Sequence, residues 1–166
     1  MGTAMTAMEG TLLAVDVGMR AGLAWFGADG RLLHSRSARF ANRAVLRRAV
    51  PAILAERPPV RLVVLEGMGP VADIWMRCLE RQGLPFEQVS AETWREAMLL
   101  RRERRSGEQA KQHAARLAAP LLAGTGHPRP DDIGDDEAEA ILCGLWAVRA
   151  LLPTLARPVR GPSAPQ

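Results

Sequence analysis

The sequence predicts an α/β fold with a mixed five-stranded sheet, whose first three strands are antiparallel and whose faces are flanked by helices. Two observations lead to this prediction. Three short strand patterns come first in the chain of 166 residues, and helical and strand patterns alternate after them. This order is typical of a sheet that mixes antiparallel and parallel pairs. The length fits one domain, which we place at residues 11–152.

The first three strands are predicted from short apolar segments and one turn. They are expected at residues 12–16, 22–26 and 31–35. Between the second and third lies Ala28-Asp29-Gly30, which indicates a hairpin because glycine tolerates a positive φ. We therefore expect an antiparallel meander at the start of the fold.

Helices and strands alternate in the middle of the chain. Helices are expected at residues 41–57, 71–82 and 91–100, and strands at 61–66 and 85–89. Pro51 is expected to kink the first helix or to begin its second part. The apolar run at 61–66 favours a strand buried on both faces. Gly83 is expected to cap the end of the helix at 71–82.

The last third is predicted to be helical, with two polar connections. Residues 101–107 are expected to form a basic loop, and Ser106 near its end has the spacing of a capping box with Gln109. Helices are expected at 107–122 and 135–152, joined by a loop at 123–134. We expect residues 1–10 to be flexible and the proline-rich tail at 153–166 to be disordered.

Composition narrows the class of protein. The net charge of +4 and the pI of about 10.3 fit a nucleic-acid partner, although many basic proteins bind none.

Cys78 and Cys143 lie in apolar helical patterns, which favours buried thiols, and no zinc-ligand motif occurs. No apolar stretch reaches 18 residues without a charge or proline, and no signal-peptide pattern is present. We therefore expect no membrane association and a cytoplasmic location.

Acidic residues interrupt the apolar segments at three places. Asp16 and Glu66 end the strands at 12–16 and 61–66, and Asp136 and Glu139 open the last helix. If those strands are parallel neighbours, their two acids lie side by side, while the helical pair shares one face. The four carboxylates would then surround a small volume that suits Mg²⁺ or Mn²⁺. Two such ions can hold the attacking water and the leaving oxygen when a phosphodiester is hydrolysed.

Each acid alone has a simpler explanation. A lone aspartate near a glycine is usually a turn residue, and an acid at a helix start is usually a cap or a partner of the helix dipole. Asp135 also offers a rival position for the role of Asp136. The combination of four acids, rather than any one of them, points to a metal site.

The motifs around these acids resemble those of the RuvC-type Holliday junction resolvases, within the RNase H-like nuclease superfamily. The resemblance covers roughly residues 11–150 in order and spacing. The family's first strand, turn and second strand resemble L-L-A-V-D-V-G-M-R-A-G-L-A-W in this chain. Its second acidic strand resembles L-V-V-L-E-G, and its closing segment resembles D-D-E-A-E-A-I-L. S-G-E-Q-A-K-Q-H resembles the stretch that carries a family lysine, and Lys111 is the only lysine of this chain.

The resemblance implies an RNase H-like fold and a metal-dependent DNA endonuclease that resolves four-way junctions by paired phosphodiester hydrolysis. It implies two Mg²⁺ ions per active site, with Mn²⁺ as a substitute. Their ligands, which are also the catalytic acids, would be Asp16, Glu66, Asp136 and Glu139. Lys111 would act beside the scissile phosphate as a further catalytic residue.

This chain departs from the family at two points. Glu139 stands where the family carries aspartate, and Gly67-Met68-Gly69-Pro70 stands where cellular members carry an aromatic wedge. Trp75, one turn later, is better explained as a core or interface residue than as a replacement wedge.

Branched DNA and a second copy of the chain are the expected partners. The basic loop and Lys111 are expected to hold the DNA backbone, although a solvated loop explains the cluster equally well; its arginines are Arg101, Arg102, Arg104 and Arg105. A junction has two strands to cut, which favours a twofold homodimer. The helix at 71–82 is a candidate interface, or a plain core face, through Ile74, Trp75, Cys78 and Leu79.

Three other functions stay open. An RNase H-like nuclease acting on RNA–DNA hybrids or flaps would share the fold and the acids. A sugar-kinase or actin-like ATPase also carries the motif D-x-G after a strand, in its phosphate loop. Such proteins need two domains of this kind and a longer chain. A non-catalytic nucleic-acid-binding module is disfavoured because all four acids are present.

Overall fold

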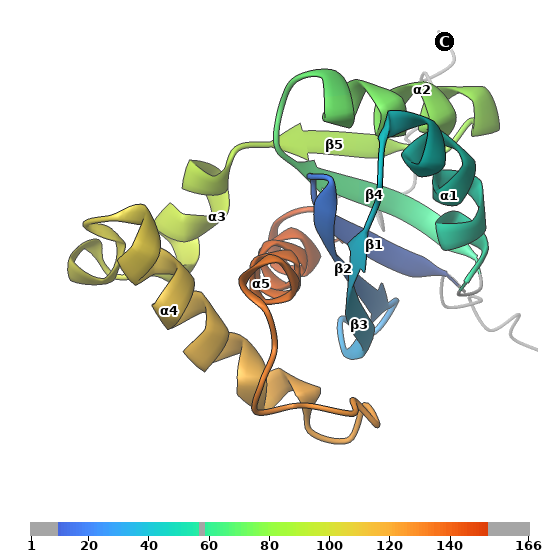
Figure 1. Cartoon of the computed structure of the whole chain (residues 1–166). Helices are drawn as coiled ribbons and strands as arrows, with labels where there is room; N and C mark the ends of the chain where they lie inside the picture. Colours follow the sequence, from blue (N-terminus) through green and yellow to red (C-terminus); the bar gives the residue numbers. More distant parts are fainter. Residues whose placement is uncertain (1–9, 57–58, 153–166) are drawn as a thin grey trace, which may run out of the picture.

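The computed structural model describes residues 10–56 and 59–152, and a five-stranded sheet lies at its centre (Figure 1). The strands are β1 (Thr11–Asp16), β2 (Arg20–Gly27), β3 (Leu32–Arg39), β4 (Val60–Glu66) and β5 (Phe86–Val89), in the order β3-β2-β1-β4-β5. The pairs β1–β2 and β2–β3 are antiparallel, whereas β1–β4 and β4–β5 are parallel. The predicted mixed sheet is confirmed. The predictions of flexible residues 1–10 and a disordered tail lie outside the described residues, apart from Gly10.

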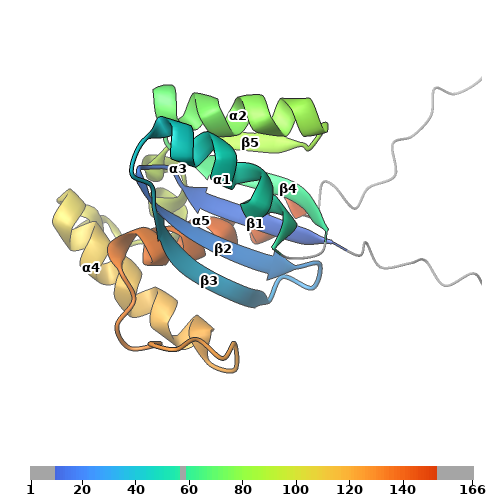
Figure 2. The ribbon, with the colours of Figure 1, turned by 45° about the vertical axis from the view of Figure 1, so that its right-hand side comes forward.

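Helices cover both faces of the sheet (Figure 2). On one face pack α1 (Arg43–Ala55) and α2 (Pro70–Gln82); on the other lie α3 (Ala91–Met98), α4 (Gly107–Ala118) and α5 (Asp135–Ala150). The strand side chains alternate between these layers, so that Leu13 and Val15 face α1 and α2 while Leu12 and Ala14 face α5. No helix within residues 10–56 and 59–152 is long and apolar enough to cross a membrane.

Helix α5 lies directly on β1 and β2 because two glycines remove side chains at the contact. A Cβ built on Gly22 would lie 1.7 Å from the carbonyl oxygen of Asp136. One built on Gly144 would lie 2.2 Å from a ring carbon of Phe26. Since real Cβ atoms do not approach so closely, both positions require glycine for this packing.

Several element boundaries differ from the sequence prediction. β3 continues to Arg39 because its polar end still pairs with β2, as far as the partners Arg20 and Arg39. α1 passes through Pro51 as one helix, because the proline is exposed while Ile53 and Leu54 continue the buried stripe. Two short 3₁₀ helices occur at Arg101–Arg104, inside the predicted basic loop, and at Ala119–Leu122, where a proline prevents α4 from continuing.

The apolar face of α2 belongs to the core of this chain. Ile74, Trp75, Cys78 and Leu79 are all buried against the sheet and α1. An interface through these four side chains is therefore wrong, and the plain core explanation is correct. Cys143, in α5, is also buried and free, as is Cys78.

Candidate active site

Asp16 and Glu66 end two neighbouring parallel strands. The β1–β4 register pairs the Cα atoms of these two residues directly. Both side chains continue the side of the sheet that carries Ala14 and Val64, which faces α5. The predicted adjacency of the two acids is therefore present, and Glu66 is buried.

Helix α5 brings the other two acids to the same edge. Glu139 is buried and Asp136 half-buried, whereas Asp135 is exposed. The charges of Asp136 and Glu139 both raise the pKa of Asp16, which places them near its carboxyl group. Of the two rival positions, Asp136 and not Asp135 therefore belongs to the cluster.

Burial and mutual repulsion favour protons on two of the acids. Burial, followed by the charges of Glu66, Glu139 and Asp136, raises the pKa of Asp16 from 3.8 to about 8. Burial and then the charge of Glu139 raise the pKa of Glu66 from 4.5 to about 7. Burial, followed by the charges of Glu66, Asp16 and Glu139, also raises the pKa of the Cys143 thiol. A cluster of this kind is stabilised by an added positive charge.

Lys111 reaches the acids from α4. Ser106 caps this helix, because its Oγ accepts a hydrogen bond from the backbone N–H of Gln109. A buried stripe of alanines then packs α4 in the core beside α5; it consists of Ala110, Ala114 and Ala118. Lys111 lies beside that stripe, half-buried, and its charge lowers the pKa of both Asp16 and Glu66.

Helix α3 supplies partners for two of the acids. Trp94 Nε1 donates a hydrogen bond of 2.7 Å to Glu66 Oε2, and both side chains are buried. Arg95 forms an ion pair and a hydrogen bond with Glu139, and its guanidinium carbon lies 5.4 Å from the centre of the Trp94 ring. Neither residue was predicted from the sequence, because the mixed pattern of this helix does not show which side chains face inward.

Arg20 pairs with Asp136 from the start of β2. Its Nε lies 2.6 Å from Asp136 Oδ2. The contact lacks hydrogen-bond geometry, so that this buried oxygen accepts no hydrogen bond within the described residues. Arg20 lies four residues after Asp16 in the first motif, and this position was the one sign in the sequence that Arg20 belongs to the site.

The acids offer suitable ligands for a divalent metal ion but do not form a complete cage. Within residues 10–56 and 59–152, no three histidine, cysteine or acidic side chains are placed to hold an ion together. The all-oxygen set of donors and the unsatisfied Oδ2 of Asp136 nevertheless fit Mg²⁺ or Mn²⁺. Since Arg20 and Arg95 occupy two of the carboxylates, metal binding would have to displace these ion pairs.

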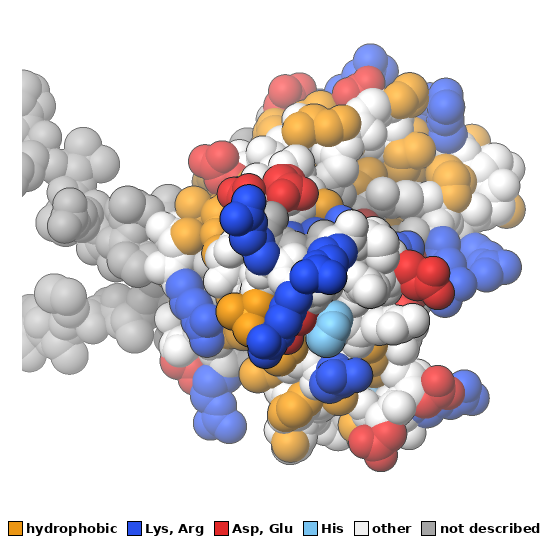
Figure 3. All heavy atoms as spheres, turned by 90° about the vertical axis from the view of Figure 1, so that its left-hand side faces the viewer, with side chains coloured by type: hydrophobic (Ala, Val, Ile, Leu, Met, Phe, Trp, Pro, Cys, Tyr) orange, Lys and Arg blue, Asp and Glu red, His pale blue; other side chains and the backbone are white. Residues whose placement is uncertain are grey.

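The predicted basic loop lies on the side of the molecule formed by α3 and α4. Arg101, Arg102 and Arg105 are exposed there, and the side chain of Arg104 lies outside what the structure describes. This side shows several basic side chains with a few acidic ones among them (Figure 3). The arginines are thus accessible to a DNA backbone, and the same exposure fits a solvated loop.

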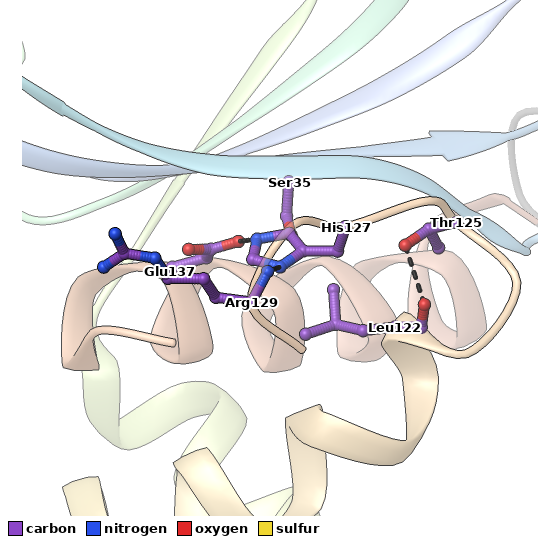
Figure 4. Close-up of polar contacts among 6 residues, drawn as sticks. All are labelled: Ser35, Leu122, Thr125, His127, Arg129 and Glu137. Carbon is purple, nitrogen blue, oxygen red and sulfur yellow. Dashed lines mark hydrogen bonds and ion pairs between the residues drawn. The ribbon is translucent and has the colours of Figure 1, made fainter. Parts of the chain in front are cut away.

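A buried polar network fixes the first turn of α5 (Figure 4). Ser35 Oγ donates a hydrogen bond of 2.6 Å to Glu137 Oε1, and His127 Nε2 lies 2.7 Å from the same oxygen. The backbone N–H of Arg129 donates to His127 Nδ1 at 3.0 Å, so the imidazole proton is on Nε2 and faces Glu137. The network joins β3 and the loop before α5 to a residue between Asp136 and Glu139. Ser35 lies 102 residues before Glu137 in the sequence, which is why no motif indicated their contact.

Glu66 is followed by Gly67-Met68-Gly69-Pro70, the segment that stands where cellular members of the resembled family carry an aromatic wedge. Met68 is 64% exposed, and Gly67 and Gly69 on either side have φ angles of 126° and 87°. Such angles favour glycine. Trp75 is fully buried and therefore does not replace the aromatic wedge.

Solved structures of a viral resolvase share this fold. The crystal structure of the fowlpox virus Holliday junction resolvase matches 85% of this chain and 99% of its own, with a TM-score of 0.65 and 14% identity. The fowlpox virus resolvase in complex with substrate Holliday junction DNA matches 89% of this chain and 99% of its own, with a TM-score of 0.59 and 12% identity. No family model and no curated protein sequence matches the chain. The structural likeness confirms the predicted RNase H-like fold.

Proposed function

We propose that the protein is a metal-dependent DNA endonuclease that resolves four-way junctions. The observation that carries this proposal is the pair of register-matched acids, Asp16 and Glu66, facing two more acids on α5. The fold that carries the cluster is shared with the fowlpox virus Holliday junction resolvase. Clusters of buried carboxylates with raised pKa values are typical of functional sites.

The acids are the proposed ligands of two Mg²⁺ ions. These are Asp16, Glu66, Asp136 and Glu139. When bound, the ions would supply a hydroxide nucleophile and stabilise the leaving oxygen of the phosphodiester. Lys111 would stabilise negative charge on the phosphate, because it already lies beside Asp16 and Glu66. Arg20 and Arg95, once released from their carboxylates, would be free to contact the same phosphate.

A homodimer is part of this proposal. Symmetric cleavage of a junction needs two active sites related by a twofold axis. The buried face of α2 does not provide the interface, so the proposed dimer rests on the symmetry of the substrate alone.

Cleavage of matched substrates tests the activity. A synthetic four-way junction, a duplex, a flap and an RNA–DNA hybrid of the same sequence are incubated with the protein, with Mg²⁺ and with EDTA. We expect paired cuts in the junction that require Mg²⁺. Preferential cleavage of the hybrid or the flap would instead assign a different nuclease activity to the same site.

Asp16→Asn is the first variant to test the metal site. It keeps the shape of the side chain but removes one ligand charge, so cleavage should fall to background while junction binding is retained or tighter. Glu80→Gln, which neutralises an exposed acid on α2, is the matched control and should cleave normally. If Asp16→Asn retained its activity, the assignment of the acids would be refuted.

A further inference from the structure

The edge of the sheet that carries the acids also carries a line of arginines. Because β2 runs antiparallel to β1 and β3, the end of β1, the start of β2 and the end of β3 lie at one edge. Arg20 and Arg39 are Cα partners there, two and three strands away from β4. Neighbouring strands are about 4.8 Å apart, which places Arg39 on the order of 10 Å from the β1 position of Asp16.

The line continues onto the start of α1. Asn42 caps this helix through a hydrogen bond from the N–H of Val45 to its Oδ1, and Arg43 is the first helical residue. Arg47 follows one turn later, and both arginines are exposed. Residues 37–55 contain four arginines and no acidic residue.

This arrangement of charge is unfavourable for the helix itself. The N-terminus of a helix carries a partial positive charge, which acids stabilise and arginines do not. The first turn of α1 contains no acid, and Arg43 and Arg47 form a like-charged pair at the spacing i, i+4. A feature that opposes local stability is expected where a function requires it.

Three of the exposed arginines in this region have no acidic partner among the described residues. Within residues 10–56 and 59–152, Arg20 pairs with Asp136 and Arg36 with Glu56, but no carboxylate pairs with Arg39, Arg43 or Arg47. The other exposed positions in the first half of α1 include Ala44, which is small, and Arg48. The surface therefore presents positive charge without bulky or acidic side chains between the arginines.

We propose that Arg39, Arg43 and Arg47 form a second basic surface that binds the phosphate backbone of one DNA arm. This inference rests on the proposed function. The surface follows β3, one outer strand of the sheet, whereas the segment at Arg101–Arg104 follows β5, the other outer strand, and α3. Asp16 and Glu66 end β1 and β4, which lie between these two strands in the sheet, so a DNA strand held by both basic segments would pass over the acids. Backbone contacts of this kind bind without sequence preference and weaken with salt.

Salt-dependent binding of the full chain to a four-way junction tests the surface. The variant Arg39→Gln/Arg43→Gln/Arg47→Gln is compared with Arg31→Gln/Arg77→Gln/Arg81→Gln, which removes the same charge from three exposed arginines away from the acid edge. Fluorescence anisotropy is measured in EDTA over a series of salt concentrations. We expect the first variant to bind about 10-fold or more weaker and its log–log salt slope to fall by roughly 2 to 3, since each lost phosphate contact contributes about 0.9. The control should lose less than about 3-fold.

Equal losses in the two triple variants would overturn the proposal, because net charge alone would then explain them. Thermal melts check that each variant is folded; if the first triple variant unfolds, the three single variants are measured in the same way, each with an expected slope change of about 1. Failure of the wild-type protein to cleave any junction would contradict the proposed function instead. A wild-type protein that cleaves, with both triple variants alike, would refute the second basic surface only.

Discussion

Lys111 lies where its charge acts on two of the four acids, and in the proposed function it would also act on the phosphate. Its charge lowers the pKa of Asp16 and Glu66, opposing the effects of burial and of the neighbouring acids. It is the only lysine in a chain whose other basic residues, apart from histidines, are arginines. An ammonium group is a compact charge on a flexible stem, whereas guanidinium is a planar group that spreads its charge. In the proposed function, Lys111 would therefore place a compact charge where negative charge develops on the phosphate.

Replacing this lysine should slow cleavage more than it affects folding. Lys111→Met keeps the length of the side chain but removes its charge, and we expect a fall in the single-turnover cleavage rate of about 100-fold, as for other lost stabilisers of transition-state charge. Lys111→Arg should restore part of the rate. The melting temperature reports on folding in parallel. A Met variant that cleaves at the wild-type rate would show that Lys111 only balances the charge of the acids.

Trp94 shows why some residues of the site could not be predicted. Its indole N–H satisfies a buried oxygen of Glu66, but a tryptophan in a short helix is more often a core residue, and this one is both. The four acids could be predicted because charge inside an apolar run is visible in the sequence. Their partners Arg20, Trp94 and Arg95 depend on how distant elements pack, which the sequence pattern does not record.

At the scale of elements, the docking of α5 on β2 sets the geometry of the site. Two acids come from α5 and two from the strands beneath it, so that a small displacement of the helix separates the pairs. Gly22 is the closest point of this contact, opposite Asp16 in the β1–β2 register. The network of Ser35, His127 and Glu137 joins the same turn to β3 and to the loop before α5.

Gly22→Ala should therefore damage both stability and activity. The added Cβ would lie 1.7 Å from the backbone oxygen of Asp136, so α5 must shift, and overpacking of this kind costs about 1–3 kcal/mol. Gly107→Ala is the control, because nothing lies within 4 Å of a Cβ there and alanine favours a helix. Urea unfolding and junction cleavage are measured for both. Unchanged unfolding and cleavage in Gly22→Ala would contradict this account of α5.

The strands and most helices could be predicted because their apolar periodicity is strong. The predictions were wrong or ambiguous at two places. The end of β3 is polar and was cut short at residue 35, although backbone pairing with β2 carries it to Arg39. The apolar face of α2 was consistent with both an interface and a core, since periodicity shows that a face is buried but not what covers it.

At the scale of the whole molecule, four acids gather at one edge of the sheet, and exposed arginines lie at Arg39, Arg43 and Arg47 and at Arg101, Arg102 and Arg105. Exposed positive charge of this kind favours an anionic ligand. Gathering the acids concentrates unfavourable repulsion among them when no cation is bound. The stability of the protein should therefore depend on pH and on metal in a specific direction.

Without metal, the protein should lose stability as the pH rises from about 4 to about 8. The folded-state pKa of Asp16 is raised from 3.8 to about 8 and that of Glu66 from 4.5 to about 7, so the folded protein binds more protons than the unfolded chain in this range. Each such proton lowers the free energy of unfolding by up to about 1.4 kcal/mol per pH unit.

Thermal melts in EDTA between pH 5 and pH 8 measure this loss, and Asp16→Asn isolates one of its sources. The variant should lose less stability than wild type over the range, because its amide does not ionise. Mg²⁺ at pH 8 should raise the melting temperature of wild type more than that of the variant, since it binds the ionised acids of the folded state. Parallel melting curves for the two proteins at every pH, with and without Mg²⁺, would show that the acids do not act as one coupled cluster.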